Sequence, residues 1–142
     1  MSSVRGSIAS RRPPLHSVNV RRGGILLLSV VVTFVVMRTM MAFRPNADFT
    51  VAGYNIHPFT GLVILTVCGL PLALGLGPGR LGDVLAAGFG IGLSLALDEW
   101  VYLIATDGSN ASYLLPVSFW GGVVMVAAAV LYIAILIWRR PR

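Results

Sequence analysis

The amino-acid sequence predicts an all-α fold, an integral membrane bundle of four transmembrane helices. Of the 142 residues, 56% are hydrophobic and 11% are charged, whereas a soluble domain carries about 25% charged residues. The apolar residues fall into four runs, each near the ~20 residues that a helix needs to cross ~30 Å of hydrocarbon. Strands of a membrane barrel would be about half as long and would alternate in polarity. The composition excludes a disordered chain and disfavours a soluble domain.

The four spans are expected in chain order after an arginine-rich tail. Residues 1–22 contain Arg, Ser and Pro without apolar periodicity and are expected to form a disordered cytoplasmic tail. The apolar run at 23–43 exceeds the about 7–15 residues of a signal-peptide core, so it is expected to be retained as the first span. The other spans are expected at 57–77, 83–105 and 115–138, and a cytoplasmic basic tail at 139–142.

The connections between the spans differ in composition. A polar loop is expected at 44–56, a tight turn at 78–82 and a third loop at 106–114. Asp83 is expected to cap the third span, because a carboxylate there accepts hydrogen bonds from unpaired backbone N–H groups. Aromatic side chains, which are enriched at membrane interfaces, are expected near the outer one at Tyr54, Phe59, Tyr113 and Trp120.

Arginine placement predicts the orientation. All eleven basic residues are arginine, and nine of them lie in the N-terminal tail, the turn at Arg80 and the C-terminal tail. Because basic residues mark the cytoplasmic side of membrane proteins, both termini are expected in the cytoplasm of a cell-membrane protein. The net charge of +6 is then explained by topology, so the lipid bilayer rather than nucleic acid is the expected partner. The single cysteine, Cys68, excludes an internal disulfide.

Four ionisable residues fall inside the expected spans or at their outer ends. They are Arg38, His57, Asp98 and Glu99. With a rise of 1.5 Å per residue, Arg38 lies about 7.5 Å from the outer end of its span and Asp98 about 10 Å from the end of the third. All four are therefore expected in the outer half of the bilayer. Because ionisable groups are costly there, they are candidates for one polar cluster.

Small residues indicate which face of the third span is buried. Gly88, Gly92 and Ala96 recur every four residues, a spacing that allows close approach of helices. The same stripe continues to Glu99, which is expected to face the bundle with Asp98 beside it. On the second span, His57, Gly61 and Cys68 share one face with Thr60 and Ile64.

Two of these segments carry a family resemblance. The first is Ile56-His57-Pro58-Phe59-Thr60-Gly61, and the second combines Gly90-Ile91-Gly92 with Leu97-Asp98-Glu99-Trp100. Over residues 55–101 the chain resembles a group of small uncharacterised prokaryotic integral membrane proteins with an I-H-[HP]-F-x-G-like segment and a G-x-G helix ending in L-D-E-[FW]. Here Pro58 replaces a second histidine, which weakens a metal site, and the resemblance supplies no reaction or ligand.

Three function classes remain open from the sequence. The first is a structural or accessory membrane protein whose polar cluster locks the bundle or recognises a membrane partner, either a second copy or another protein. The second is a transport component that binds an ion, a proton or a divalent metal through His57, Asp98 and Glu99. The third is an intramembrane enzyme at the outer leaflet with a carboxylate as base. No cofactor is predicted, and Arg38 either pairs with a carboxylate or extends to the lipid phosphates.

Overall fold

The protein is an all-α bundle of four long helices. The structure is a computed structural model and describes residues 15–43, 50–51, 54–55, 57–107 and 110–139. The long helices are α1 (Leu15–Phe43), α2 (His57–Ala73), α3 (Gly79–Ala105) and α5 (Pro116–Trp138), and a short helix, α4 (Asn110–Tyr113), precedes α5. Within the described residues, α1 from Val20 onward, α3 and α5 are long and apolar enough to cross a membrane, and α2 is a shorter apolar helix. The length and apolar composition of these helices identify the chain as a membrane protein.

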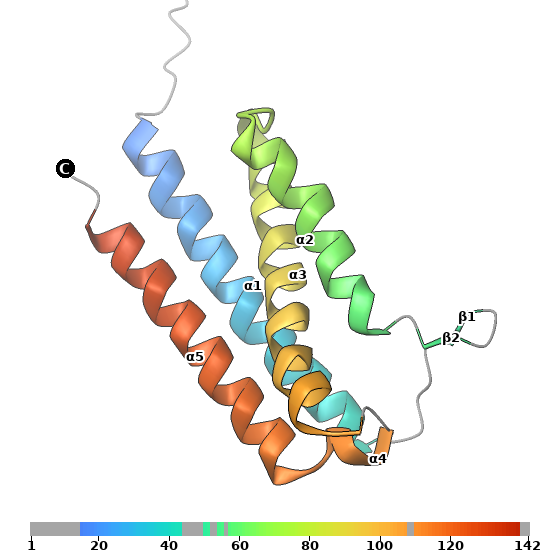
Figure 1. Ribbon diagram of the computed structural model, residues 1–142. Helices are drawn as coiled ribbons and strands as arrows, with labels where there is room; N and C mark the ends of the chain where they lie inside the picture. The colour runs from blue at the N-terminus through green and yellow to red at the C-terminus, as the bar shows by residue number, and fades with distance from the viewer. Residues whose placement is uncertain (1–14, 44–49, 52–53, 56, 108–109, 140–142) are drawn as a thin grey trace, which may run out of the picture.

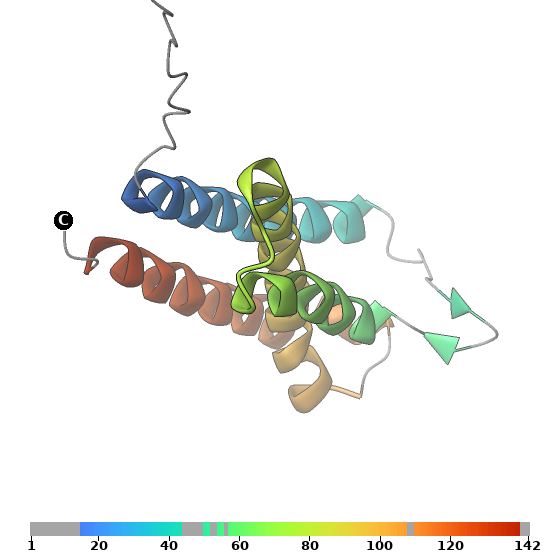
Figure 2. The ribbon, with the colours of Figure 1, turned by 90° about the horizontal axis from the view of Figure 1, so that it is seen from above.

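Successive long helices run in opposite directions (Figure 1). As a result, the start of α1, the end of α5 and the α2–α3 turn lie at one end of the bundle. The central helix is α3, which packs against α1, α2 and α5, whereas α2 contacts mainly α3. Figure 2 shows α1 and α5 running side by side. A polar group on α3 can therefore meet groups from every other long helix.

The expected loop at 44–56 contains two short strands. Strand β1 (Thr50–Val51) pairs antiparallel with β2 (Tyr54–Asn55), with Thr50 opposite Asn55 and Val51 opposite Tyr54. The hairpin lies beside the start of α2 (Figure 1). The third expected loop likewise contains α4.

The first helix begins earlier than predicted, at Leu15 rather than residue 23. The expectation of a disordered tail over residues 1–22 is therefore wrong for residues 15–22. Side-chain contacts explain the extension, because Arg21 pairs with Asp83 and Arg22 donates a hydrogen bond of 2.5 Å to the Gly77 carbonyl oxygen. These contacts fix the first turns of α1 against the α2–α3 turn. Residues 1–14 and 140–142 of the two expected tails lie outside the described residues.

The second helix ends before its expected limit at residue 77. Gly75 has a φ of 71°, and the N–H groups of Gly75 and Leu76 donate hydrogen bonds to the carbonyl oxygens of Leu72 and Pro71 at 3.1 and 2.8 Å. This is the Schellman arrangement, in which a left-handed glycine closes a helix. The turn consequently occupies residues 74–78 instead of 78–82.

The third helix begins at Gly79 rather than at Asp83. Pro78 takes the N-cap position with extended backbone and no side-chain cap, and proline restricts the residue that precedes it to non-helical backbone. Asp83 lies one turn inside α3, where it pairs with Arg21 and, at 3.7 Å, with Arg22 Nε. The prediction that Asp83 caps the helix is therefore wrong, since its carboxylate serves an ion pair.

Glycines allow the helices to approach closely along α3. A Cβ on Gly61 of α2 would lie 2.7 Å from the backbone N of Ala96, and one on Gly90 would lie 2.6 Å from the Leu26 carbonyl oxygen of α1. Gly88 similarly leaves room for the Cys68 sulfur. Such contacts stabilise helix association in a membrane, where lipid is as apolar as the side chains and the hydrophobic effect does not drive the helices together. An apolar core of Val30, Val126 and Ile133 joins α1 to α5.

We expect the substitution Gly61→Ala to destabilise the bundle, because its methyl group would collide with the α3 backbone. Overpacking of this kind costs roughly 1–3 kcal/mol. Thermal melting in detergent measures the effect. Gly24→Ala is the control, since a Cβ there meets no atom within 4 Å. Equal melting temperatures for the two variants would contradict the close packing of α2 on α3.

Candidate functional site

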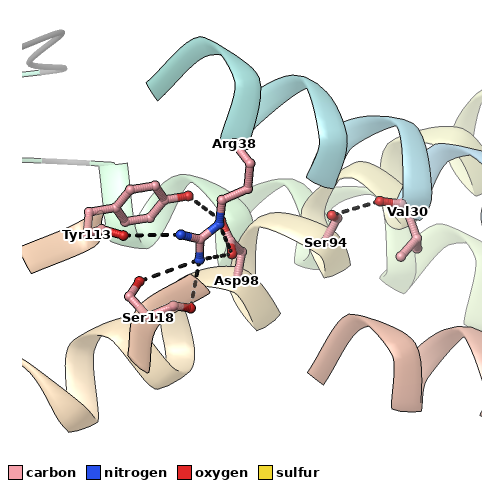
Figure 3. Close-up of polar contacts among 6 residues, drawn as sticks. All are labelled: Val30, Arg38, Ser94, Asp98, Tyr113 and Ser118. Atoms are coloured by element: carbon pink, nitrogen blue, oxygen red, sulfur yellow. Dashed lines mark hydrogen bonds and ion pairs between the residues drawn. The ribbon is translucent and has the colours of Figure 1, made fainter. Parts of the chain in front are cut away.

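A buried ion pair joins α1 to α3. Arg38 of α1 donates hydrogen bonds from Nε and Nη2 to Oδ1 of Asp98, at 2.9 and 2.5 Å (Figure 3). The side chains are 9% and 4% exposed, respectively. Arg38 therefore pairs with a carboxylate inside the bundle instead of extending to the lipid phosphates. We call Arg38, Asp98, Tyr113 and Ser118 the arginine node.

The remaining donors of Arg38 reach the segment that leads into α5. Nη1 donates to the Tyr113 carbonyl oxygen at 3.1 Å, and Nη2 donates to the Ser118 carbonyl oxygen at 2.9 Å and to its Oγ at 3.5 Å. Tyr113 is the last residue of α4, where helical carbonyls lack partners within the helix. One guanidinium thus links α1, α3, α4 and α5 (Figure 3).

Aromatic rings surround the guanidinium. Its central carbon lies 4.3 Å from the ring centroid of Tyr113 and 5.7 Å from those of Phe34 and Phe119. Arg38 therefore gains cation–π attraction, which is strongest where water is excluded. The rings also shield the ion pair from solvent and lipid.

The Tyr113 hydroxyl group completes the coordination of Asp98 by donating a hydrogen bond to Oδ2. Its side chain is buried, and burial together with the Asp98 carboxylate raises the pKa of Tyr113 far above its usual value of 10.0. The phenol therefore stays protonated and remains a donor. Tyr113 is expected near the outer interface, and its side chain is 6% exposed because it points into the node.

Space for the ion pair comes from a glycine on α5. A Cβ on Gly122 would collide with Asp98 Oδ1 and would lie 2.8 Å from Arg38 Nη2. Ser118 lies one turn before it, and both are buried on the face of α5 that packs on α3. This pair of small residues four apart is the sequence signal for the α5 side of the node, which a prediction from ionisable residues alone misses.

Glu99 is also buried, at 2% exposure. Because adjacent residues of a helix are about 100° apart, it lies on a different face of α3 from Asp98. It continues the stripe through Gly92 and Ala96 that packs against α2. Gly61 of α2 contacts Ala96 of α3. His57, the first residue of α2, lies about 6 Å before Gly61 along the axis of α2. Glu99 lies about 4.5 Å beyond Ala96 along α3, which runs in the opposite direction. His57 and Glu99 are therefore at the same level of the α2–α3 seam. The His57 side chain lies outside the described part.

The four expected cluster residues thus separate into two groups. Arg38 and Asp98 meet in the arginine node, whereas Glu99 and the backbone of His57 lie along the α2–α3 seam. Among the described residues, no group of three or more His, Cys, Asp or Glu side chains is placed to hold a metal ion. Asp98 accepts hydrogen bonds at both oxygens from Arg38 and Tyr113, so it suits structural linkage better than metal ligation.

Comparisons of the chain with protein-family models, with curated proteins and with solved structures found no match.

We expect Gly122→Ala to weaken the node, because the added methyl group occupies the space of Asp98 Oδ1. The cost is roughly 1–3 kcal/mol of unfolding free energy, as for other overpacked cores. Thermal melting in detergent measures it. Ala127→Val adds volume to an exposed site of the same helix and should leave the melting temperature nearly unchanged. A Gly122→Ala protein as stable as wild type would refute the tight fit.

We expect the stability that Tyr113 contributes to be lost at alkaline pH. The folded pKa is raised above 10.0, so the contribution is complete below pH 10 and falls as the pH rises beyond it. The difference in melting temperature between wild type and Tyr113→Phe should be constant from neutral pH to about pH 9 and shrink above pH 10. A difference that grows with pH would contradict the donor role of the phenol.

Proposed function

We propose that this chain is a small polytopic membrane protein of structural or accessory type, in which the arginine node locks the helix bundle. The main support is that the guanidinium of Arg38 donates hydrogen bonds to acceptors on α3, α4 and α5. A charge in hydrocarbon is tolerated when protein groups replace its hydration. The buried node is thus better suited to holding helices than to meeting a partner.

We further propose that the chain lies in the cell membrane with both termini in the cytoplasm. Arg21, Arg22 and Arg139 lie at the end of the bundle that contains the start of α1 and the end of α5. The α2–α3 turn, with Arg80 just after it, lies at the same end. This concentration of arginine agrees with the rule that basic residues stay on the cytoplasmic side.

Membership of the group of prokaryotic membrane proteins described above is also proposed. The two segments that carry the resemblance pack against each other, with Gly61 of the first against Gly92 of the second. The partner of such a protein is the lipid bilayer, together with a second copy or another membrane protein. The outer face of α2 supports this, since Leu62, Val63 and Val67 are each more than half exposed.

A double-mutant cycle tests the locking role. Asp98→Asn leaves the Arg38 charge buried without its counter-charge, so we expect a loss of about 3–5 kcal/mol of unfolding free energy in detergent. Arg38→Met should cost a similar amount, and the double variant should cost less than the sum. Asp83→Asn is the matched control, because its nearer partner Arg21 is 59% exposed and exposed pairs contribute about 1 kcal/mol or less. Strictly additive losses for Arg38 and Asp98 would overturn the proposal.

A second candidate function is proton or cation binding along the α2–α3 seam. Supporting it are the 2% exposure of Glu99 and its position level with His57. Buried carboxylates in membrane helices commonly serve proton or ion pathways. Metal analysis of the purified protein beside Glu99→Gln tests the cation branch: a divalent metal present in wild type and lost in the variant would support it. Equal and negligible metal in both proteins would remove it.

A further inference from the structure

A cavity of about 510 Å³ lies between the helices and extends from Leu97, the neighbour of Asp98, to Arg22 near the start of α1. Its walls are mainly apolar and come from all four long helices, with Leu26 of α1, Leu72 of α2, Phe89 and Leu93 of α3, and Ala129 and Ile133 of α5. The volume falls within the roughly 300–1,000 Å³ of small-molecule sites. The cavity is therefore suited to a hydrocarbon group.

One arginine lines the cavity, and two more lie near the same end of it. Arg22 lines it directly, and Arg21 precedes Arg22 on α1. The α5 wall ends at Ile137, whose side chain reaches Gly23, and the exposed Arg139 follows two residues later. Among the described residues, Asp83 is the carboxylate that pairs with two of these arginines, Arg21 and Arg22. The rim is therefore net positive.

We propose that this cavity binds an acyl chain of an anionic phospholipid, with the lipid phosphate at the arginine rim. The apolar walls run along helices that cross the membrane, so hydrocarbon is the solvent next to them. Basic pockets between transmembrane helices, near the membrane surface, bind anionic head groups. Apolar walls and a positive rim together match one lipid molecule better than either a free phosphate or an uncharged apolar ligand.

Two variants and one control separate the site of the acyl chain from the site of the head group. Ala129→Phe places a ring in the cavity, and Ala127→Phe adds the same ring to an exposed position of α5 outside it. Arg139→Gln removes one charge from the rim and leaves the apolar walls intact.

Native mass spectrometry of the full chain in detergent, titrated with phosphatidylglycerol or phosphatidylcholine, tests the proposal. Wild type should retain one phosphatidylglycerol and prefer it by about fivefold or more, as expected for about 1 kcal/mol per arginine. Ala129→Phe should lose retention of both lipids, and Ala127→Phe should behave as wild type. Arg139→Gln should reduce the preference for phosphatidylglycerol by about fivefold.

Equal retention of the two lipids by wild type would overturn the proposal, and so would undiminished binding by Ala129→Phe. A dimer that Ala129→Phe abolishes would identify a second copy as the occupant and would also overturn it. If circular dichroism shows that Ala129→Phe is unfolded, Arg139→Gln decides: an unchanged preference for phosphatidylglycerol contradicts the lipid site.

Discussion

The burial of one arginine charge constrains the packing of this bundle. A guanidinium cannot lose water inside a membrane protein unless other groups replace its hydrogen bonds. Arg38 obtains them from a carboxylate on α3 and from backbone carbonyl oxygens at Tyr113 and Ser118. Those acceptors must converge on one point, so the requirement fixes the positions of α1, α3 and the start of α5 relative to one another.

The close approach of helices follows from the same requirement. Asp98 reaches Arg38 only because Gly122 of α5 has no side chain where the carboxylate lies. Elsewhere Gly61, Gly90 and Gly92 bring α2 and α1 onto α3 by backbone contact, and Ser94 donates a hydrogen bond of 2.9 Å to the Val30 carbonyl oxygen (Figure 3). Small residues and buried polar bonds thus act together, which is how helices associate when lipid is as apolar as their side chains.

The all-α membrane fold was predictable, because long apolar runs with few charges have few other solutions. Boundaries were less so: α2 ends at a left-handed Gly75, and α1 extends into the tail because Arg21 and Arg22 bind near a turn distant in sequence. The rise of 1.5 Å per residue along each span predicted that Arg38 and Asp98 lie at a similar depth in the membrane. It did not separate Glu99 from them, since that depends on helix rotation. Tyr113 enters the node through a tertiary fold of the α3–α5 connection, which local composition does not encode.

Hydrogen exchange at the Arg38 guanidinium measures the central claim most directly. In nitrogen-15 NMR spectra of the protein in detergent micelles, the Nε–H group of Arg38 should exchange slowly with water, because it is buried and bonded to Asp98. The slow signal should be lost in Asp98→Asn, while the exposed Arg139 exchanges quickly in both proteins. Fast exchange of the Arg38 signal in wild type, at the rate of Arg139, would contradict the account.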